Sequence, residues 1–311
     1  MVNTLETNST RRQVSLTFLQ SRNLTADKIL ASIRPVSDDE DLLLVGSVSE
    51  GNATEKSDID LALLSMKPVT NHNGILAEHS WCQENNFYIG RNSIGFERYK
   101  LEEIQKIGPL MKVMHEKLLG QKDETVYKYP QLQLKGDQIC MMVLHRIKTG
   151  ITLIDNGVAE TWRKALFLDD LNEYIMYTWG VWYIAAKGDY ESQERGNHES
   201  GILSLRRTVA NLIDIFCAAY GLTNVKSKWQ VTKLNALRNV VAEPIIRNLI
   251  DLMVYTTAAN AYSNEIKQSL EKAKIDVYEA VLNHSKYQVT SRILEPDGRS
   301  WEDDKVVHGY H

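Results

Sequence analysis

Two aspartates, Asp58 and Asp60, stand at the start of the apolar run Ile59 to Leu64, which has the composition of a buried strand. Side chains two residues apart on a strand point to the same face and lie about 7 Å apart. Two carboxylates this close in a partly buried site repel each other unless a cation lies between them. The spacing therefore indicates a site for a divalent metal ion.

A second short motif, Gly46-Ser47, directly follows the apolar run Leu42 to Val45. A Gly-Ser turn offers backbone N–H groups and a hydroxyl, which suit an anion such as a phosphate. Ten residues separate Ser47 from Asp58. We interpret the two motifs together as a phosphate site beside a metal site, which is the arrangement that nucleotidyl transfer requires.

These residues also resemble a known family signature. Gly46-Ser47, then Gly51, then Ser57-Asp58-Ile59-Asp60-Leu61 is similar to the motif of the DNA polymerase β-like nucleotidyltransferase superfamily. The resemblance covers roughly residues 25–105 and continues as a looser similarity of helical pattern over the C-terminal half. It is closest in pattern to the aminoglycoside- and lincosamide-type nucleotidyltransferases. The fold that it implies is α+β, with a small mixed β-sheet and flanking helices, followed by an all-α helical bundle.

The spacing of apolar residues divides the chain in the same way. After Gly136, every apolar segment has helical spacing, beginning with 137–153. Before it, the pattern predicts helix over 11–33, strands over 42–46 and 58–65, a strand hairpin within 86–100, and a helix over 101–119 that Pro109 breaks or kinks. We predict a nucleotidyltransferase domain over 1–125, a helical bundle that closes over the substrate over 126–290, and a polar tail over 291–311.

The resemblance implies both a reaction and the residues that carry it. In-line attack on the α-phosphorus of a nucleoside triphosphate expels pyrophosphate while two metal ions stabilise the attacking and leaving oxygens. We expect Asp58 and Asp60 as metal ligands, and Gly46, Ser47 and Ser57 around the phosphates. The expected cofactors are two Mg²⁺ ions, which Mn²⁺ could replace, with a nucleoside triphosphate, first of all ATP, as substrate.

The superfamily takes a third carboxylate from a later strand. The family pattern aligns Gly95 with a position where aspartate is usual, and Glu97 follows two residues later on the same face. Glu97 is the candidate third metal ligand, or the base that deprotonates the acceptor hydroxyl. Two alternatives stay open: Glu97 pairs with Arg98 or a lysine on a solvated strand, or the base is an acid of the segment 168–174.

Two basic residues of the C-terminal half are candidates for binding the triphosphate. Lys228 opens a predicted helix and Arg206 lies on the preceding one. The pattern resembles the second domain of small-molecule nucleotidyltransferases, where a lysine reaches the triphosphate. A triphosphate with about four negative charges needs cations beyond two metal ions. The alternative is that both are ordinary solvated side chains.

Composition limits the other classes of function. The formal net charge of −4 over 311 residues argues against an extensive nucleic-acid surface, which usually appears as a basic domain. Three cysteines in no metal-ligand spacing indicate reduced thiols. The N-terminus does not resemble a signal peptide, and no apolar run reaches about 18 residues. We therefore expect a cytoplasmic protein without a membrane span.

These observations favour a metal-dependent nucleotidyltransferase that acts on a small molecule, for example an enzyme of antibiotic modification. It would transfer a nucleoside monophosphate to a hydroxyl or phosphate of the acceptor. The antibiotic-modifying relatives often pair to complete their sites, which implies a homodimer. The alternatives are a synthase of cyclic or linear oligonucleotide signals, and a catalytically silent nucleotide-binding regulatory protein, which Gly95 favours.

Overall fold

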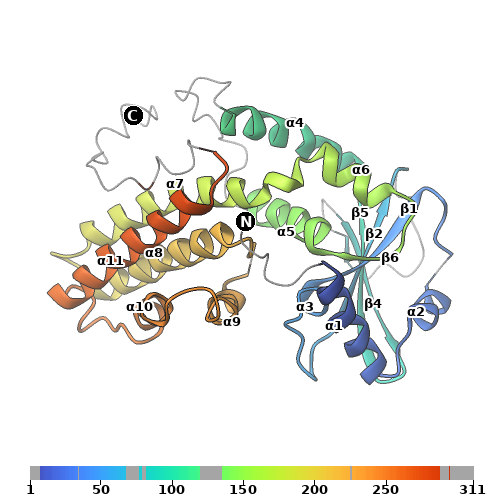
Figure 1. The fold of residues 1–311 in the computed structure, drawn as a ribbon, viewed down its shortest axis with the longest axis horizontal. Helices are drawn as coiled ribbons and strands as arrows, with labels where there is room; N and C mark the ends of the chain where they lie inside the picture. Colours follow the sequence, from blue (N-terminus) through green and yellow to red (C-terminus); the bar gives the residue numbers. More distant parts are fainter. Residues whose placement is uncertain are drawn as a thin grey trace. The chain divides into compact units, whose positions relative to one another are not determined.

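The computed structural model describes residues 8–33, 35–67, 77–78, 82–119, 135–224, 226–287 and 294. Contacts divide the chain into two compact units, which are described separately. Unit 1 holds residues 1–113 and 134–169, and unit 2 holds residues 114–133 and 170–311. Every strand of the described residues belongs to unit 1, and unit 2 is helical (Figure 1). The predicted α+β class is confirmed.

Unit 1 is built, within its described residues, on a six-stranded mixed sheet with the order β3-β4-β5-β2-β1-β6. The strands are β1 (Glu40–Val45), β2 (Ile59–Ser65), β3 (Ala77–Glu78), β4 (Cys82–Ile89), β5 (Asn92–Tyr99) and β6 (Ile151–Ile154). β2 runs parallel to β5, and all other neighbours are antiparallel. In this register Asp60 of β2 lies opposite Val45 of β1 and Gly95 of β5.

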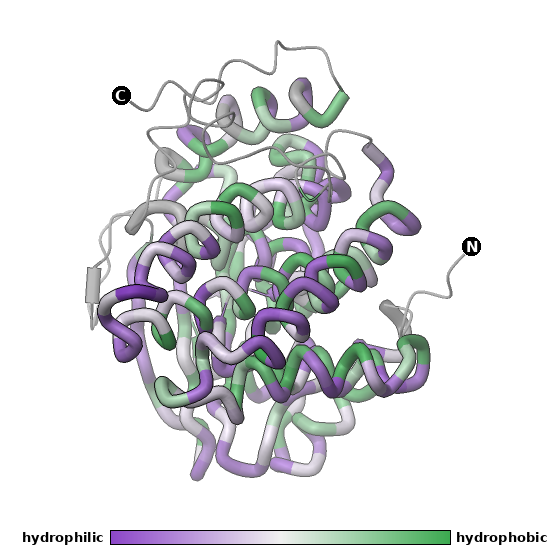
Figure 2. The backbone as a smooth tube through the Cα atoms, turned by 90° about the vertical axis from the view of Figure 1, so that its left-hand side faces the viewer, coloured by the Kyte–Doolittle hydropathy of each residue, from purple (hydrophilic) through white to green (hydrophobic). Residues whose placement is uncertain are grey.

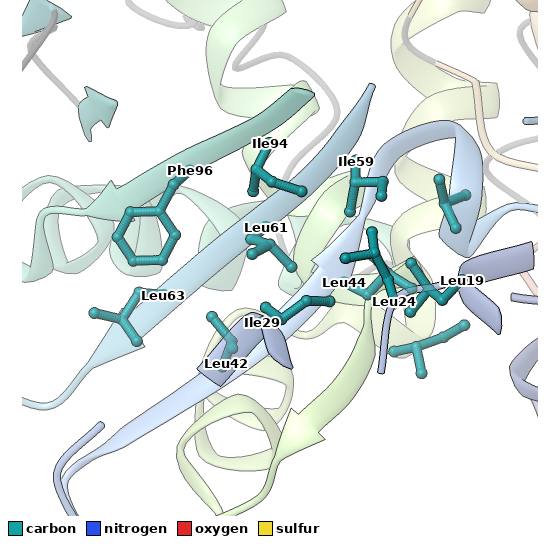
Figure 3. Packing of buried hydrophobic residues seen from close by; sticks show 12 residues of the cluster. Leu19, Leu24, Ile29, Leu42, Leu44, Ile59, Leu61, Leu63, Ile94 and Phe96 are labelled. Atoms are coloured by element: carbon teal, nitrogen blue, oxygen red, sulfur yellow. The ribbon is translucent and has the colours of Figure 1, made fainter. Parts of the chain in front are cut away.

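One face of the sheet is apolar and forms the core of unit 1 (Figure 3). Its buried side chains from the strands are Leu42, Leu44, Ile59, Leu61, Leu63, Ile94 and Phe96. Helices α1 (Asn8–Ser21) and α2 (Ala26–Ser32) cover this face, and Leu19, Leu24 and Ile29 pack against it. Because side chains alternate along a strand, Asp60 and Gly95 point to the opposite face.

Helices α5 (Lys135–Thr149) and α6 (Val158–Ala165) pack against β1. Gly150, which follows α5, allows the end of this helix to lie close to β1. A Cβ added there would lie 2.7 Å from the Arg146 carbonyl oxygen and 3.2 Å from the side chains of Leu43 and Val45. Leu43 and Val45 alternate with the core residues of β1, so α5 reaches the face that carries Asp60.

The boundary near residue 125 differs from the prediction. We expected helix over 137–153 as part of a bundle, but α5 ends at Thr149 and β6 pairs antiparallel with β1. The buried Asp41 of β1 strengthens this connection, since it accepts the backbone N–H groups of Asn156 and Ala159. Residues 134–169 therefore belong to unit 1. A four-residue segment such as Ile151–Ile154 is too short for its apolar spacing to separate a strand from a helix end.

The other predicted elements of unit 1 agree more closely with the structure. The predicted strands over 42–46 and 58–65 are β1 and β2, and the hairpin within 86–100 is β4–β5. The helical segment 11–33 is divided into α1 and α2, and Thr25 caps α2 by accepting the Lys28 backbone N–H at 3.3 Å. Pro109 lies inside α4 (Leu101–Leu118) and does not end it.

Unit 2 is a helical bundle, as predicted for the C-terminal half. Its helices are α7 (Leu171–Ser192), α8 (His198–Ala219), α9 (Gln230–Ala236), α10 (Glu243–Val254) and α11 (Asn264–His284). α7, α10 and α11 all pack against α8. Figure 2 shows hydrophobic and hydrophilic residues alternating along the helices, as expected of amphipathic packing. Within the described residues, no helix combines the length and the apolar composition that a membrane crossing needs.

A buried carboxylate on α8 connects three segments of unit 2. Asp214 accepts hydrogen bonds from Trp179 Nε1 of α7 at 3.1 Å, Asn224 Nδ2 at 2.8 Å and Gln230 Nε2 at 3.0 Å. Burial raises the pKa of Asp214 from 3.8 to about 6, although these three hydrogen bonds and the nearby Lys233 favour the ionised form. The folded state therefore holds this proton more tightly than the unfolded chain does.

We predict that Asp214 makes the protein less stable as the pH rises. Between its unfolded pKa of 3.8 and its folded pKa of about 6, the folded state binds more protons, so the free energy of unfolding falls with pH. Relative to Asp214→Asn, the wild type should lose up to about 3 kcal/mol between about pH 4 and pH 7. Urea unfolding of both proteins measures this. If the stability of the wild type relative to the variant stayed constant or rose with pH, the prediction would be wrong.

Candidate active site

The carboxylate of Asp60 lies against two residues that have no side chain. A Cβ added at Gly46 would lie less than 3.0 Å from Asp60 Oδ2, closer than real Cβ atoms come, and one added at Gly95 would lie 3.0 Å from Asp60 Oδ1. Gly46 also has a φ of +70°, which favours glycine. The half-buried carboxylate thus occupies space that exists only because both neighbours are glycines.

Asn86 completes the row of residues across the sheet. It pairs with Gly95 in the β4–β5 hairpin, and its Oδ1 lies 3.5 Å from where a Gly95 Cβ would be. Gly95 therefore leaves a gap between the Asp60 carboxylate and an exposed side-chain amide. Sequence reasoning missed Asn86, because only the exact register of the hairpin brings this residue to the row of Asp60.

Four of the predicted site residues lie in the turn and loop between β1 and β2, namely Gly46, Ser47, Ser57 and Asp58. Gly46 and Ser47 open the short helix α3 (Gly46–Ser49), and the Ser47 carbonyl accepts the Asn52 N–H at 2.9 Å. Asp58 is exposed and directly precedes β2. Because β1 and β2 are antiparallel neighbours, the structure brings Gly46, Ser47, Asp58 and Asp60 to one edge of the sheet.

Ser57 has a structural role in the same loop. Its hydroxyl accepts the Thr54 backbone N–H at 2.9 Å, and its own N–H donates to the Thr54 carbonyl at 2.9 Å. Arg22, at the end of α1, donates to the Ser57 carbonyl at 3.1 Å. These contacts close the turn before Asp58, so Ser57 as a phosphate ligand stays a prediction.

Glu97 forms an ion pair with Arg146 of α5. Glu97 pairs with Ala62, which lies two residues beyond Asp60 on β2 and on the same face of the sheet. Both side chains are largely buried, with 15% of Glu97 and 7% of Arg146 exposed. Burial lowers the pKa of Arg146, but the acidic groups of Tyr99, Glu97 and Asp60 outweigh this effect and raise it. Arg146 is therefore a permanent cation close to two predicted metal ligands.

The residue before Arg146 makes a second contact with the site. His145 Nε2 lies 2.9 Å from Oε1 of Glu50, which directly follows α3. Both side chains are largely buried. Consecutive residues of α5 thus bind the end of the Gly46 turn and strand β5. No sequence motif marks His145 or Arg146, because their role depends on how α5 packs against the sheet.

The acidic residues fit a divalent ion only in part. In the stretches of chain that the structure describes, no group of three or more His, Cys, Asp and Glu side chains is arranged to hold a metal. The structure therefore does not gather Asp58, Asp60 and Glu97 into a three-carboxylate centre. Asp58 and Asp60 alone suit Mg²⁺, which proteins often bind through one or two carboxylates together with substrate phosphates.

The remaining candidates lie in unit 2. Lys228 and Arg206 are both exposed. Lys228 Nζ lies 4.9 Å from the centre of the Trp229 ring, and Arg206 Nη2 donates to the Thr256 carbonyl at 3.5 Å. Their roles in binding a triphosphate stay predictions.

The acids of segment 168–174 have structural contacts within unit 2. Asp170 Oδ2 lies 3.0 Å from His115 Nδ1 and accepts the Tyr287 hydroxyl at 3.0 Å. Glu173 accepts from the Ser285 hydroxyl at 2.6 Å. Burial, and then donation to Asp170, raise the pKa of Tyr287 to about 12. These acids hold the chain that follows α11 against the start of α7.

Comparison with known proteins gives one family match. Residues 26–127 match the family model described as the nucleotidyltransferase domain. A search of curated proteins gives no match. Among solved structures, a nucleotidyltransferase-like protein from Exiguobacterium sibiricum 255-15 is similar over 88% of this chain and 77% of that chain. Its sequence identity of 12% and TM-score of 0.41 are too low to carry an argument.

We predict that Gly46→Ala destabilises the protein more than Gly51→Ala does. The two glycines have φ values of +70° and +72°, so the backbone cost of alanine, roughly 1–2 kcal/mol, is common to both. Only at Gly46 does the new Cβ meet Asp60, whereas at Gly51 the nearest atom is Val14 Cγ1 at 4.0 Å. Crowding should add about 1–3 kcal/mol at Gly46.

Urea unfolding of the two variants gives both losses under the same conditions. Gly51→Ala is the matched control, because it carries the same backbone strain without the crowding. Equal losses in the two variants would show that the Asp60 carboxylate does not lie against Gly46.

Proposed function

We propose that the protein transfers a nucleoside monophosphate from a nucleoside triphosphate to a small molecule. The match of residues 26–127 to the family model of the nucleotidyltransferase domain supports this proposal. The acceptor group would be a hydroxyl or a phosphate, and pyrophosphate would leave. The observation that carries the proposal is the placement of Asp60 between Gly46 and Gly95, next to Asp58 and the Gly46-Ser47 turn.

Each residue of this site has a proposed part in holding the nucleotide. The Gly46-Ser47 turn would hold the terminal phosphates through its backbone N–H groups and the Ser47 hydroxyl. Asp58 and Asp60 would hold a divalent ion, Mg²⁺ or Mn²⁺. When bound, that ion neutralises phosphate charge and the charge that develops on the leaving pyrophosphate. Lys228 and Arg206 are proposed as further cations for the triphosphate.

The proposed reaction would benefit from the fixed position of the Asp60 carboxylate. Transfer requires the α-phosphate to be held in line with the acceptor, and errors of about 1 Å in position can cost about a hundredfold in rate. Asp60 cannot rotate freely, because a carboxylate oxygen lies against each of two backbone segments. A strand and a tight turn thus orient this ligand before any nucleotide binds.

A second candidate function is a protein that binds nucleotide without turning it over. The observation that favours it is the Glu97–Arg146 ion pair. Because Arg146 holds the Glu97 carboxylate in a largely buried ion pair, Glu97 can take a proton from an acceptor hydroxyl only if this pair separates. If the reaction requires Glu97 as a base, this site would bind a nucleoside triphosphate and release it unchanged.

We predict that Asp60→Asn lowers turnover by at least about a hundredfold, since it removes one negative charge from the ion site. The assay uses labelled ATP, GTP, CTP or UTP with Mg²⁺ or Mn²⁺, without and then with candidate acceptors, and measures pyrophosphate release. Asp38→Asn is the matched control, because Asp38 is an exposed acid of the turn before β1 and lies outside the site. This control should keep wild-type turnover.

The products of the assay separate the candidate functions. Pyrophosphate release that requires an acceptor supports small-molecule transfer. Oligonucleotide products formed without an acceptor support a signal synthase, and binding without turnover supports the silent protein. The absence of both turnover and nucleotide binding, with all four nucleotides, would overturn the proposal.

A further inference from the structure

We propose that the site holds a single divalent cation together with the nucleotide, and that Arg146 is the built-in positive charge that keeps Glu97 out of the metal shell. The inference rests on the proposed function and deepens it, because it specifies how many ions the site takes. It also replaces the expected pair of Mg²⁺ ions, because the acidic residues that the structure describes form no group of three or more that could hold a metal.

Strand β5 has no ligand to offer in the row of Asp60. The residue opposite Asp60 is Gly95, and the next residue along the row is Asn86. An amide oxygen is a neutral donor and does not replace the charge of a carboxylate. On the β5 side of Asp60, the site therefore lacks the second acid that would be shared between two ions.

Glu97 has neither oxygen available to an ion that arrives with the nucleotide. Oε1 is engaged by Arg146, and Oε2 is buried without a hydrogen-bond partner among the described residues. Glu97 also pairs with Ala62, two residues beyond Asp60 on β2. Metal coordination by Glu97 would require its ion pair to break and the carboxylate to turn.

Breaking this ion pair costs free energy because the buried Arg146 side chain can neither move with Glu97 nor turn out into solvent. Only 7% of its side chain is exposed, and guanidinium keeps its proton at any pH at which the protein folds. The helix that carries it is fixed by the neighbouring His145–Glu50 contact and by the close approach of Gly150 to β1. Separating the pair would leave two buried charges without partners.

Arg146 also reduces the negative charge that the protein itself offers to cations. Asp58, Asp60 and Glu97 contribute three negative charges and Arg146 contributes one positive charge, so these four side chains carry −2 before a nucleotide binds. A second divalent ion bound by these side chains would lie near a guanidinium of like sign, which interacts with Asp60.

Native mass spectrometry of the full-length protein with Mn²⁺ and α,β-methylene-ATP, which is not cleaved between the α- and β-phosphates, counts the ions directly. We expect one Mn²⁺ in each protein–nucleotide complex. The double variant Asp58→Asn/Asp60→Asn supplies the background of non-specific adducts. Two specifically bound ions would overturn this inference and leave the proposed function standing, whereas binding of neither nucleotide nor Mn²⁺ would overturn both.

A second measurement tests Glu97 on its own. Glu97→Gln keeps the size of the side chain and an oxygen that can accept from Arg146. The Kd of Mn²⁺ in the presence of the analogue should rise by less than about tenfold in Glu97→Gln and by more than about tenfold in Asp60→Asn. A rise of tenfold or more in Glu97→Gln would overturn the inference. If this variant fails to fold, the wild-type ion count decides alone.

Discussion

Space for one half-buried carboxylate is the constraint on which the candidate site depends. Asp60 lies where any side chain at position 46 or 95 would crowd it. Gly46 also begins the turn after β1, and Gly95 also lies in the row where β5 could offer a further ligand. The same two glycines that make room for Asp60 therefore also shape the turn after β1 and leave β5 without a side chain opposite Asp60.

Side chains alternate between the two faces of the sheet, and this alternation separates the candidate site from the core. On β2, Ile59, Leu61 and Leu63 enter the core, whereas Asp60 lies on the other face. A shift of one residue in the pairing of β2 would bury Asp60 among apolar side chains and expose the core residues. The several fully buried side chains of this core thus fix the register that places Asp60 between its glycines.

Much of this arrangement could be predicted, because its signals are local. The Asp-x-Asp pair, the Gly-Ser turn, the β4–β5 hairpin and the Thr25 cap each lie within a few residues. Strand β6 and the contacts of α5 could not be predicted. β1 and β6 are about a hundred residues apart, and the four residues of β6 are too few to show a distinctive period. The ion pair of Glu97 could not be predicted for the same reason, because its partner Arg146 lies about fifty residues further along the chain. Glu97 as a third metal ligand stays a prediction.

Helix α5 shows why the motif alone does not determine the chemistry of the site. The segment that matches the nucleotidyltransferase domain ends at residue 127, before α5 begins at Lys135. Yet His145 contacts Glu50, which directly follows the Gly46-Ser47 turn, and Arg146 forms an ion pair with Glu97. A chain could keep every residue from Gly46 to Leu61 and still change the charge of the site through one residue of α5. The charge around Asp60 therefore depends on the helix that packs against the sheet as well as on the motif itself.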